Sequence, residues 1–244
     1  MTSASASGKR HGLARVLSKM GLASRTEAAR LIAAGTVRVN GRVIRDPEHP
    51  VHMGSDRIET GAGHAEARPF MAIMLNKPRG AVTTRSDERE RSTVYDCLPA
   101  DMPWLAPVGR LDKASEGLLL FCNDPVWAAG ITHPETGPDK TYHVQIDRIP
   151  DQALLKRLRA GVETDLGFLA AKRIELLRHG EKHAWLEITL DEGRNRQIRR
   201  LLEGFDIRVL RLIRTAIGRL PLGNLPKGQW RPLSDEELAL LNHA

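Results

Sequence analysis

The sequence of 244 residues has few cysteines, few aromatic residues and no long apolar run. The two cysteines, Cys97 and Cys122, form no CxxC pattern, which argues against a disulfide framework and favours a cytoplasmic protein. No apolar run reaches the roughly 18 residues that suggest a membrane span, so we expect no membrane partner. Aromatic residues make up only 4%, and the core must therefore consist mainly of Leu, Ile, Val and Ala.

Acidic residues are outnumbered by basic ones, and the excess is uneven along the chain. The net charge is +7 and the isoelectric point is about 9.8. Residues 1–63 carry 10 Lys/Arg and 5 Asp/Glu, a net charge of +5, and the remainder carries 27 and 25, a net charge of +2. Such a balance indicates a polyanionic partner, most often nucleic acid, although basic proteins without one exist.

Composition and periodicity divide the chain into four parts. Residues 1–10 are rich in Ser and Ala and are expected to form a disordered tail. Residues 11–60 read as a small module, residues 61–69 as a linker without period, and residues 70–244 as a second domain. We find no internal repeat of useful period.

The small module has signals for two helices and a hairpin. Leu13, Val16, Leu17 and Met20 follow helical spacing up to Gly21, and Ser24 with Glu27 predicts a capping box at the start of a second helix that ends near Gly35. The turn signal Asn40-Gly41 joins a strand at 37–39 to a returning strand at 42–44.

The second domain has more strand signals than helix signals. Strands are predicted at 70–75, 118–122, 141–146, 173–177 and 185–190, and helices at 151–160 and 196–203. Long helices do not alternate regularly with these strands. The fold class is therefore α+β, with a small helical and hairpin module followed by a mixed, mainly antiparallel sheet.

Basic residues occur on both the predicted helices and the predicted hairpin of the small module. Helix and hairpin cations can track a phosphate backbone, and the alternative is a solvated basic face. The run from Leu13 to Val51 resembles the S4 RNA-binding domain, and this resemblance implies binding to structured RNA. We assign RNA binding here to Arg15, Lys19, Arg25, Arg38 and Arg42.

A loop carboxylate precedes an apolar strand in the second domain. The segment is Gly-Arg-Leu-Asp-Lys-Ala-Ser-Glu-Gly-Leu-Leu-Leu, residues 109–120, with the carboxylate at Asp112. A carboxylate on a loop held by a rigid sheet is well placed for catalysis. Taken alone, a loop Asp is usually a cap or a solvated turn residue, and Asp112 could simply cap a turn at residues 113–115.

This segment resembles the catalytic motif of pseudouridine synthases that modify ribosomal RNA. Three more blocks resemble family motifs in the family's order: residues 74–80, residues 140–144 (Lys-Thr-Tyr-His-Val) and residues 192–200, which contain Gln-Ile-Arg. Ala114 departs from the acidic or polar residue common at its position. The resemblance implies a catalytic domain of pseudouridine synthase fold over residues 70–244.

The resemblance also implies roles for single residues. Asp112 is the catalytic carboxylate, as a nucleophile or as a base towards a sugar proton. Arg199 stands beside it, and Tyr142 stacks on the target base and assists proton transfer, although a strand tyrosine could simply pack on the sheet. Arg110 fills the space of the extruded base or contacts phosphate. We assign phosphate contacts to Arg194, Arg196 and Arg200.

The expected reaction converts uridine to pseudouridine and requires no cofactor and no metal. His179 and His183 are four apart, but no third ligand is evident. The alternatives are a non-catalytic RNA-binding ribosome-assembly factor and a glycosidase that cuts the same bond. The expected partner is ribosomal RNA or an assembly intermediate. The sequence leaves the oligomeric state open, and without a coiled-coil or interface stripe we expect a monomer.

Overall fold

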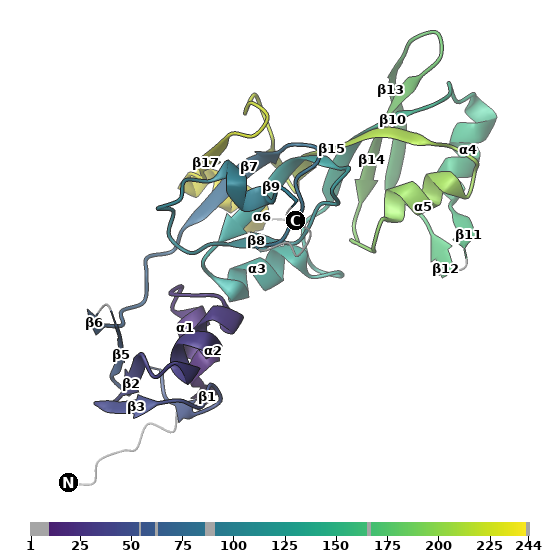
Figure 1. Ribbon diagram of the computed structural model, residues 1–244. Coiled ribbons are helices and arrows are strands. Elements are labelled where there is room, and N and C mark those ends of the chain that lie inside the picture. Colours follow the sequence, from purple (N-terminus) through teal and green to yellow (C-terminus); the bar gives the residue numbers. More distant parts are fainter. Residues whose placement is uncertain (1–9, 54, 62, 86–90, 165–166, 243–244) are drawn as a thin grey trace. The chain divides into compact units, whose positions relative to one another are not determined.

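The computed structural model describes residues 10–53, 55–61, 63–85, 91–164 and 167–242. It divides the chain into two compact units (Figure 1). The first comprises residues 1–71, 102–106 and 122–125, and the second comprises residues 72–101, 107–121 and 126–244. The tail expected at residues 1–10 lies outside the described residues, apart from Arg10.

Short helices and strands make up the first unit, and they confirm the elements predicted between residues 13 and 44. Two helices, α1 (Leu13–Lys19) and α2 (Arg25–Ala33), pack together. A sheet of order β3-β2-β5-β6 and the antiparallel pair β1–β4 complete the unit. The strands are β1 (His11–Gly12), β2 (Val37–Val39), β3 (Arg42–Ile44), β4 (Pro50–Val51), β5 (Ile58–Thr60) and β6 (Gly63–His64).

Local signals in this unit act nearly as the sequence predicts. The Ser24 hydroxyl accepts a hydrogen bond from the Glu27 backbone N–H at 3.1 Å and caps α2. The predicted capping box is only half formed, because the Glu27 carboxylate accepts a bond from Arg30 at 3.1 Å instead. Asn40 and Gly41 both have positive φ, at 51° and 80°, as a type I′ hairpin turn requires.

Part of the segment expected to be an unstructured linker is ordered. Within residues 61–69, strand β6 pairs antiparallel with β5, and Ala65 is buried against the apolar cluster of the first unit. Gly and Ala give no periodic signal here, so pairing with the preceding strand β5 decides the conformation.

A mixed sheet forms the second unit. Within the described residues it has nine strands, with the path β13-β14-β10-β15-β9-β7-β17, and with β16 beside β15 and β8 beside β9. Most assigned pairings are antiparallel, as predicted, whereas β9 and β15 run parallel. The strands are β7 (Ala72–Lys77), β8 (Ala106–Val108), β9 (Glu116–Cys122), β10 (Lys140–Ile146), β13 (Arg173–His179), β14 (Ala184–Leu190), β15 (Val209–Ile217), β16 (Leu220–Pro221) and β17 (Trp230–Pro232).

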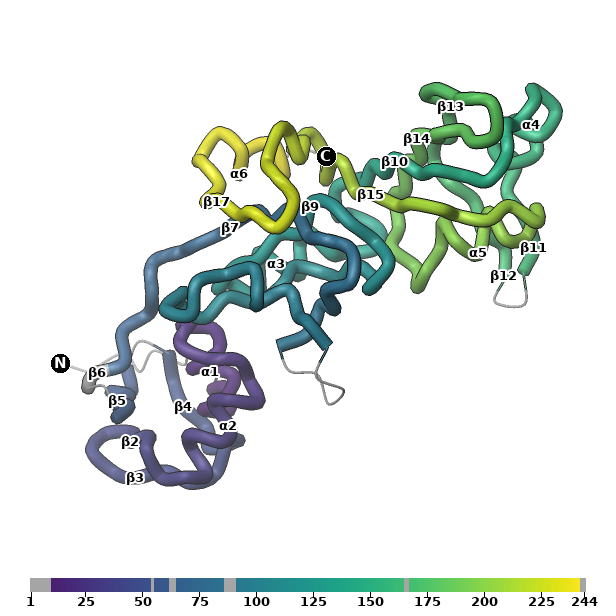
Figure 2. Tube along the Cα trace, turned by 45° about the horizontal axis from the view of Figure 1, so that its top comes forward, coloured from purple at the N-terminus to yellow at the C-terminus, as the bar shows by residue number. Residues whose placement is uncertain are grey.

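Helices and one hairpin complete the second unit. They are the 3-10 helix η1 (Val94–Cys97), α3 (Pro125–Thr132), α4 (Gln152–Ala160), α5 (Gln197–Glu203), α6 (Asp235–Asn242) and the pair β11 (Val162–Thr164) and β12 (Gly167–Leu169). Helix α5 lies beside the β11–β12 hairpin in both views (Figure 2). The predicted strands and helices are all found with shifted ends, and β15, α3 and α6 are elements that the sequence did not indicate.

The core of this unit fixes the strands that carry the site. Val144, Leu186 and Leu201 belong to one buried cluster that joins β10 and β14 to α5. Because successive strand residues face opposite sides, Lys140 and Tyr142 share the Val144 side of β10. At the junction of β9 and β15, Gly117 has a φ of 100°, and a Cβ there would overlap the Arg214 carbonyl oxygen, so this close approach requires glycine.

Candidate active site

Asp112 lies on the loop between β8 and β9, and this loop is fastened by backbone contacts. Gly109 begins it with a φ of 74°, and the Ser115 N–H donates to the Asp112 carbonyl at 3.0 Å. The Thr83 hydroxyl donates to the Leu111 carbonyl at 2.7 Å. These bonds hold the loop in one conformation, so the carboxylate is carried on a rigid support.

Lys77, the last residue of β7, supports the same loop from within. Its side chain is fully buried, and its ammonium donates to the carbonyls of Ser115 at 2.8 Å and of Asp112 and Pro78 at 3.1 Å. Burial lowers the pKa of Lys77 to about 8, against the opposing effect of Asp112, Cys97 and Glu116. The lysine therefore positions the loop through backbone atoms and makes no hydrogen bond to the Asp112 carboxylate.

The start of β9 is held by a buried carboxylate. Glu116 accepts two bonds from Arg211, both at 3.1 Å, and one from Lys227 at 2.5 Å. Burial raises the pKa of Glu116, but these hydrogen bonds outweigh it and the net shift is downward. The Glu116 carboxylate is therefore occupied by hydrogen bonds from Arg211 and Lys227. Asp112 is the carboxylate of residues 109–120 that can contact a ligand.

The carboxylate of Asp112 faces Arg196. The Arg196 Nη1 atom lies 3.6 Å from the Asp112 Oδ2 atom, and about a third of the Asp112 side chain is exposed. Arg196 is the N-cap of α5, with a left-handed φ of 51°. The sequence predicts Arg196 as a phosphate contact, and the structure places it 3.6 Å from the Asp112 carboxylate.

Arg199, one turn further along α5, lies on the same side of the loop. Its Nη2 atom donates to the Ala114 carbonyl at 3.3 Å. Burial lowers the pKa of Arg199, as do the neighbouring charges of Arg196 and Arg79, and Asp112 opposes them. The two arginines therefore share the neighbourhood of one carboxylate, and Arg199 reaches the backbone of the loop.

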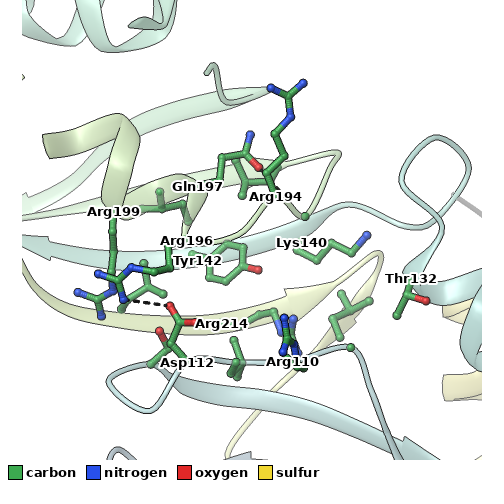
Figure 3. Close-up of a pocket in the computed structure, with 18 of the residues that line it drawn as sticks. Arg110, Asp112, Thr132, Lys140, Tyr142, Arg194, Arg196, Gln197, Arg199 and Arg214 are labelled. Carbon is green, nitrogen blue, oxygen red and sulfur yellow. Dashed lines mark hydrogen bonds and ion pairs between the residues drawn. The ribbon is translucent and has the colours of Figure 1, made fainter. Parts of the chain in front are cut away.

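Asp112, Tyr142 and Arg199 line a single pocket of about 190 Å³. Figure 3 shows the Tyr142 ring with the Asp112–Arg196 pair on one side and Lys140 on the other. Among the described residues, Asp112 is the only carboxylate that lines this pocket, against six cations: Arg110, Lys140, Arg194, Arg196, Arg199 and Arg214. A single carboxylate among six cations makes the pocket suited to an anionic ligand.

Among the predicted phosphate contacts in this unit, Arg194 makes hydrogen bonds within the protein itself. It donates to Glu192 at 2.8 Å and to the Phe168 carbonyl at 3.0 Å. Gln197, which is buried, donates to Glu192 at 2.7 Å and accepts from the Arg194 N–H at 3.2 Å. This network shapes the turn before α5 and presents Arg196 to the pocket.

The other predicted contacts differ in exposure. Arg110 is exposed and lines the pocket, whereas the Nε atom of Arg200 is buried and, among the described residues, has no hydrogen-bond partner. In the first unit, Arg15, Arg25, Arg38 and Arg42 are exposed and Lys19 is half-buried. Arg25 pairs with Glu48 at 3.5 Å, and Arg38 donates to the Gly41 carbonyl at 3.3 Å.

Three pocket or loop cations were not found from the sequence: Lys77, Lys140 and Arg214. Lys140 lies two residues before Tyr142 and so on the same face of β10, which a strand period of two would have indicated. Arg214 interrupts an apolar strand, and a cation in such a strand is a signal of a specific partner. Lys77 ends an apolar run before Pro78, and only the tertiary structure reveals its three carbonyl acceptors.

The described part of the chain contains no group of three His, Cys, Asp or Glu side chains that could hold a metal ion. None of its helices combines the length and apolar character needed to cross a membrane.

Comparison with known proteins agrees with this geometry. The RNA pseudouridylate synthase family matches residues 71–204, and the S4 domain matches residues 12–58. The chain is 35% identical to a ribosomal large subunit pseudouridine synthase B of Bacillus subtilis, over 94% of each protein. It is 37% identical to a ribosomal small subunit pseudouridine synthase A of Pseudomonas aeruginosa, over 93% of this chain and 98% of the relative.

A solved structure gives the same result. The crystal structure of a pseudouridylate synthase matches 96% of this chain and 100% of its own, with a TM-score of 0.66 and 25% sequence identity. The chain belongs to the RNA pseudouridylate synthase family, whose reaction is the isomerisation of uridine to pseudouridine in RNA.

Proposed function

We propose that this protein isomerises a uridine of structured ribosomal RNA to pseudouridine, with Asp112 as its catalytic carboxylate. The observation that carries the proposal is the placement of Asp112 as the single carboxylate, within the described residues, in a pocket lined by six cations. The names of the two relatives support ribosomal RNA as the substrate, one for the large and one for the small subunit.

The reaction rearranges one bond without an outside group. The bond between nitrogen 1 of uracil and carbon 1′ of the ribose breaks, and its electron pair stays on the base. The base turns, carbon 5 bonds to carbon 1′, carbon 5 loses its proton and nitrogen 1 gains one. Asp112 acts on the sugar, as a nucleophile at carbon 1′ or as a base towards the adjacent proton, and both roles need the ionised carboxylate.

The neighbours of Asp112 fit this chemistry. Arg196 and Arg199 supply positive charge beside the Asp112 carboxylate. Tyr142 offers a ring on which the extruded base can stack, and stacking repays part of the energy of leaving the RNA helix. Arg110 is exposed at the pocket and can occupy the vacated position in the RNA.

The first unit supports RNA binding by a different means. Its exposed cations on α1, α2 and the β2–β3 hairpin can contact phosphates and orient the RNA by shape. We assign RNA binding to residues 11–60, joined through residues 61–69 to a catalytic domain of residues 70–244. The protein acts as a cytoplasmic monomer in this proposal.

Carbodiimide-stop mapping of ribosomal RNA tests the proposal in cells with and without the gene. One pseudouridine should vanish on deletion and return with the wild-type gene but not with Asp112→Asn. Unchanged ribosomal RNA would contradict the substrate assignment and leave a non-catalytic assembly factor. Mass spectrometry of the RNA separates isomerisation, which conserves mass, from a glycosidase, which removes the base.

A further inference from the structure

Two largely buried cations near Tyr142, Lys140 and Arg214, have polar atoms without a hydrogen-bond partner among the described residues. Lys140 is 9% exposed and Arg214 is 5% exposed. Within the described residues, the Lys140 ammonium makes no hydrogen bond and no ion pair, and the Arg214 Nη2 atom has no hydrogen-bond partner. Both side chains line the same pocket as Asp112, so unsatisfied donors gather where a substrate would lie.

Strand register brings these two cations together. Tyr142 on β10 pairs with Arg214 on β15, and Lys140 pairs with Ile217. Arg214 is fixed by a bond from its Nε atom to the Leu118 carbonyl at 2.7 Å. Burial lowers the pKa of Lys140, and the charge of Arg214 lowers it further, against the opposing charges of Asp139 and Asp191. A buried Arg214 nitrogen without an acceptor, close to a second buried cation, is unfavourable, and a ligand with oxygen acceptors relieves that cost.

We propose that Lys140, assisted by Arg214, binds the O4 carbonyl oxygen of the target uracil and thereby selects and holds the base. This inference rests on the proposed function, because it requires a uridine with its sugar at Asp112. A base that stacks on Tyr142 with its ribose at Asp112 extends away from the carboxylate, and O4 lies on the edge of the ring far from the sugar. In Figure 3 the Lys140 side chain is on that far side of Tyr142.

The isomerisation gives this contact a second use. When the bond to the sugar breaks, the electron pair left on the ring is shared with O2 and O4, and a nearby ammonium stabilises that charge. The rotation that brings carbon 5 to the sugar exchanges nitrogen 1 with carbon 5, and likewise exchanges the two carbonyls. A donor that contacts O4 in the substrate therefore meets O2 in the product.

The same contact excludes cytidine. Cytosine carries an amino group in place of O4. This amino group and the Lys140 ammonium are both hydrogen-bond donors, so neither would have an acceptor. A backbone phosphate is a poorer occupant, because exposed cations such as Arg110 are available to it at the rim. Lys140 is nine-tenths buried and better matches a single carbonyl oxygen than a hydrated phosphate.

Chemical double-mutant cycles test the proposal with the full-length protein. The substrate is a ribosomal RNA transcript that the wild type modifies, with the target uridine replaced by 4-thiouridine or 2-thiouridine. Single-turnover rates are measured for wild type, Lys140→Met and Lys140→Arg. With ordinary uridine, Lys140→Met should slow the reaction about 10- to 100-fold, and Lys140→Arg should recover part of the rate.

The decisive result is coupling between the variant and the sulfur substitution. Sulfur at position 4 should slow wild type and have little further effect on Lys140→Met, because the same hydrogen bond is already lost. Lys182→Met, an exposed lysine between β13 and β14, should match wild type with every substrate. If Lys140→Met proves unstable in a thermal melt, Lys140→Gln replaces it in the same cycle.

Two outcomes would overturn the inference and keep the proposed function. One is additive effects with both thio-substrates. The other is weaker RNA affinity of Lys140→Met with an unchanged single-turnover rate, which indicates a phosphate contact. Failure of wild type to convert any uridine would instead contradict the proposed function.

Discussion

Arg196, and not Arg199, makes the ion pair with Asp112, at 3.6 Å from nitrogen to oxygen. Helix α5, which carries Arg199, begins only at Gln197, and Arg196 precedes it as the N-cap in a left-handed conformation. Arg199 instead donates to the carbonyl of Ala114 on the loop that carries Asp112. Arg196 therefore contacts the carboxylate itself, and Arg199 contacts the backbone of the loop that carries it.

The ion pair between Arg196 and Asp112 predicts that loss of charge at position 196 slows the reaction more than a change from Arg to Lys. Arg196→Ala should lower the maximal rate about five- to tenfold, because a half-exposed ion pair contributes about 1 kcal/mol. Arg196→Lys should retain most of the rate. Saturating single-turnover assays measure both, with Arg173→Ala on β13 as a control outside the pocket. Equal rates for Arg196→Ala and wild type would show that the pair has no catalytic role.

The lowered pKa of buried Lys77 predicts that the stability of the protein depends on pH. Its pKa of about 8 lies below the value of 10.5 for the unfolded chain, so between these values the unfolded state binds more protons and stability rises with pH. Below pH 8 the full penalty for burying the charge is present. Relative to Lys77→Met, the unfolding free energy of wild type should therefore increase by about 2 kcal/mol from pH 7 to 9.5.

Urea denaturation of both proteins at several pH values measures this difference. The Met side chain cannot titrate, so it removes the contribution of Lys77 and leaves other groups in place. Stability curves that run parallel over this range would refute the assignment of a depressed pKa to Lys77.

The sequence predicts features that short segments determine. The cap at Ser24 and the turn at Asn40-Gly41 each depend on residues within three positions, and both are found. The placement of Arg196 depends on how helix α5 starts, because Arg196 is its N-cap in a left-handed conformation and pairs with Asp112. The resemblance of the Gln-Ile-Arg block indicates only Arg199 as a neighbour of Asp112. Lys140 and Arg214 face one pocket only through the pairing of β10 with β15, which separates them by more than 70 positions in the chain.

The exposed cations of the first unit predict a salt-dependent contribution to RNA binding. Replacing Arg15, Lys19 and Arg42 together with Gln should weaken affinity at least tenfold at moderate salt, and each lost phosphate contact should reduce the slope of log affinity against log salt by about one. Filter binding across a salt series measures both quantities. Replacing Lys156, Arg173 and Lys182 with Gln removes equal charge from the second unit and should leave the slope nearly unchanged.

At saturating RNA the same triple variant should keep its single-turnover rate, because its residues lie outside the unit that holds Asp112. A slope equal to that of wild type would show that these cations form only a solvated basic face.

The role of Asp112 is the central claim, and one substitution measures it directly. Asp112→Asn keeps the size of the side chain and its loop but removes the charge. With a ribosomal RNA transcript that wild type modifies, the variant should form no detectable pseudouridine while its dissociation constant for that RNA stays within a few-fold of wild type. Pseudouridine formation at a rate near that of wild type would contradict the account, as would a parallel loss of turnover and RNA affinity.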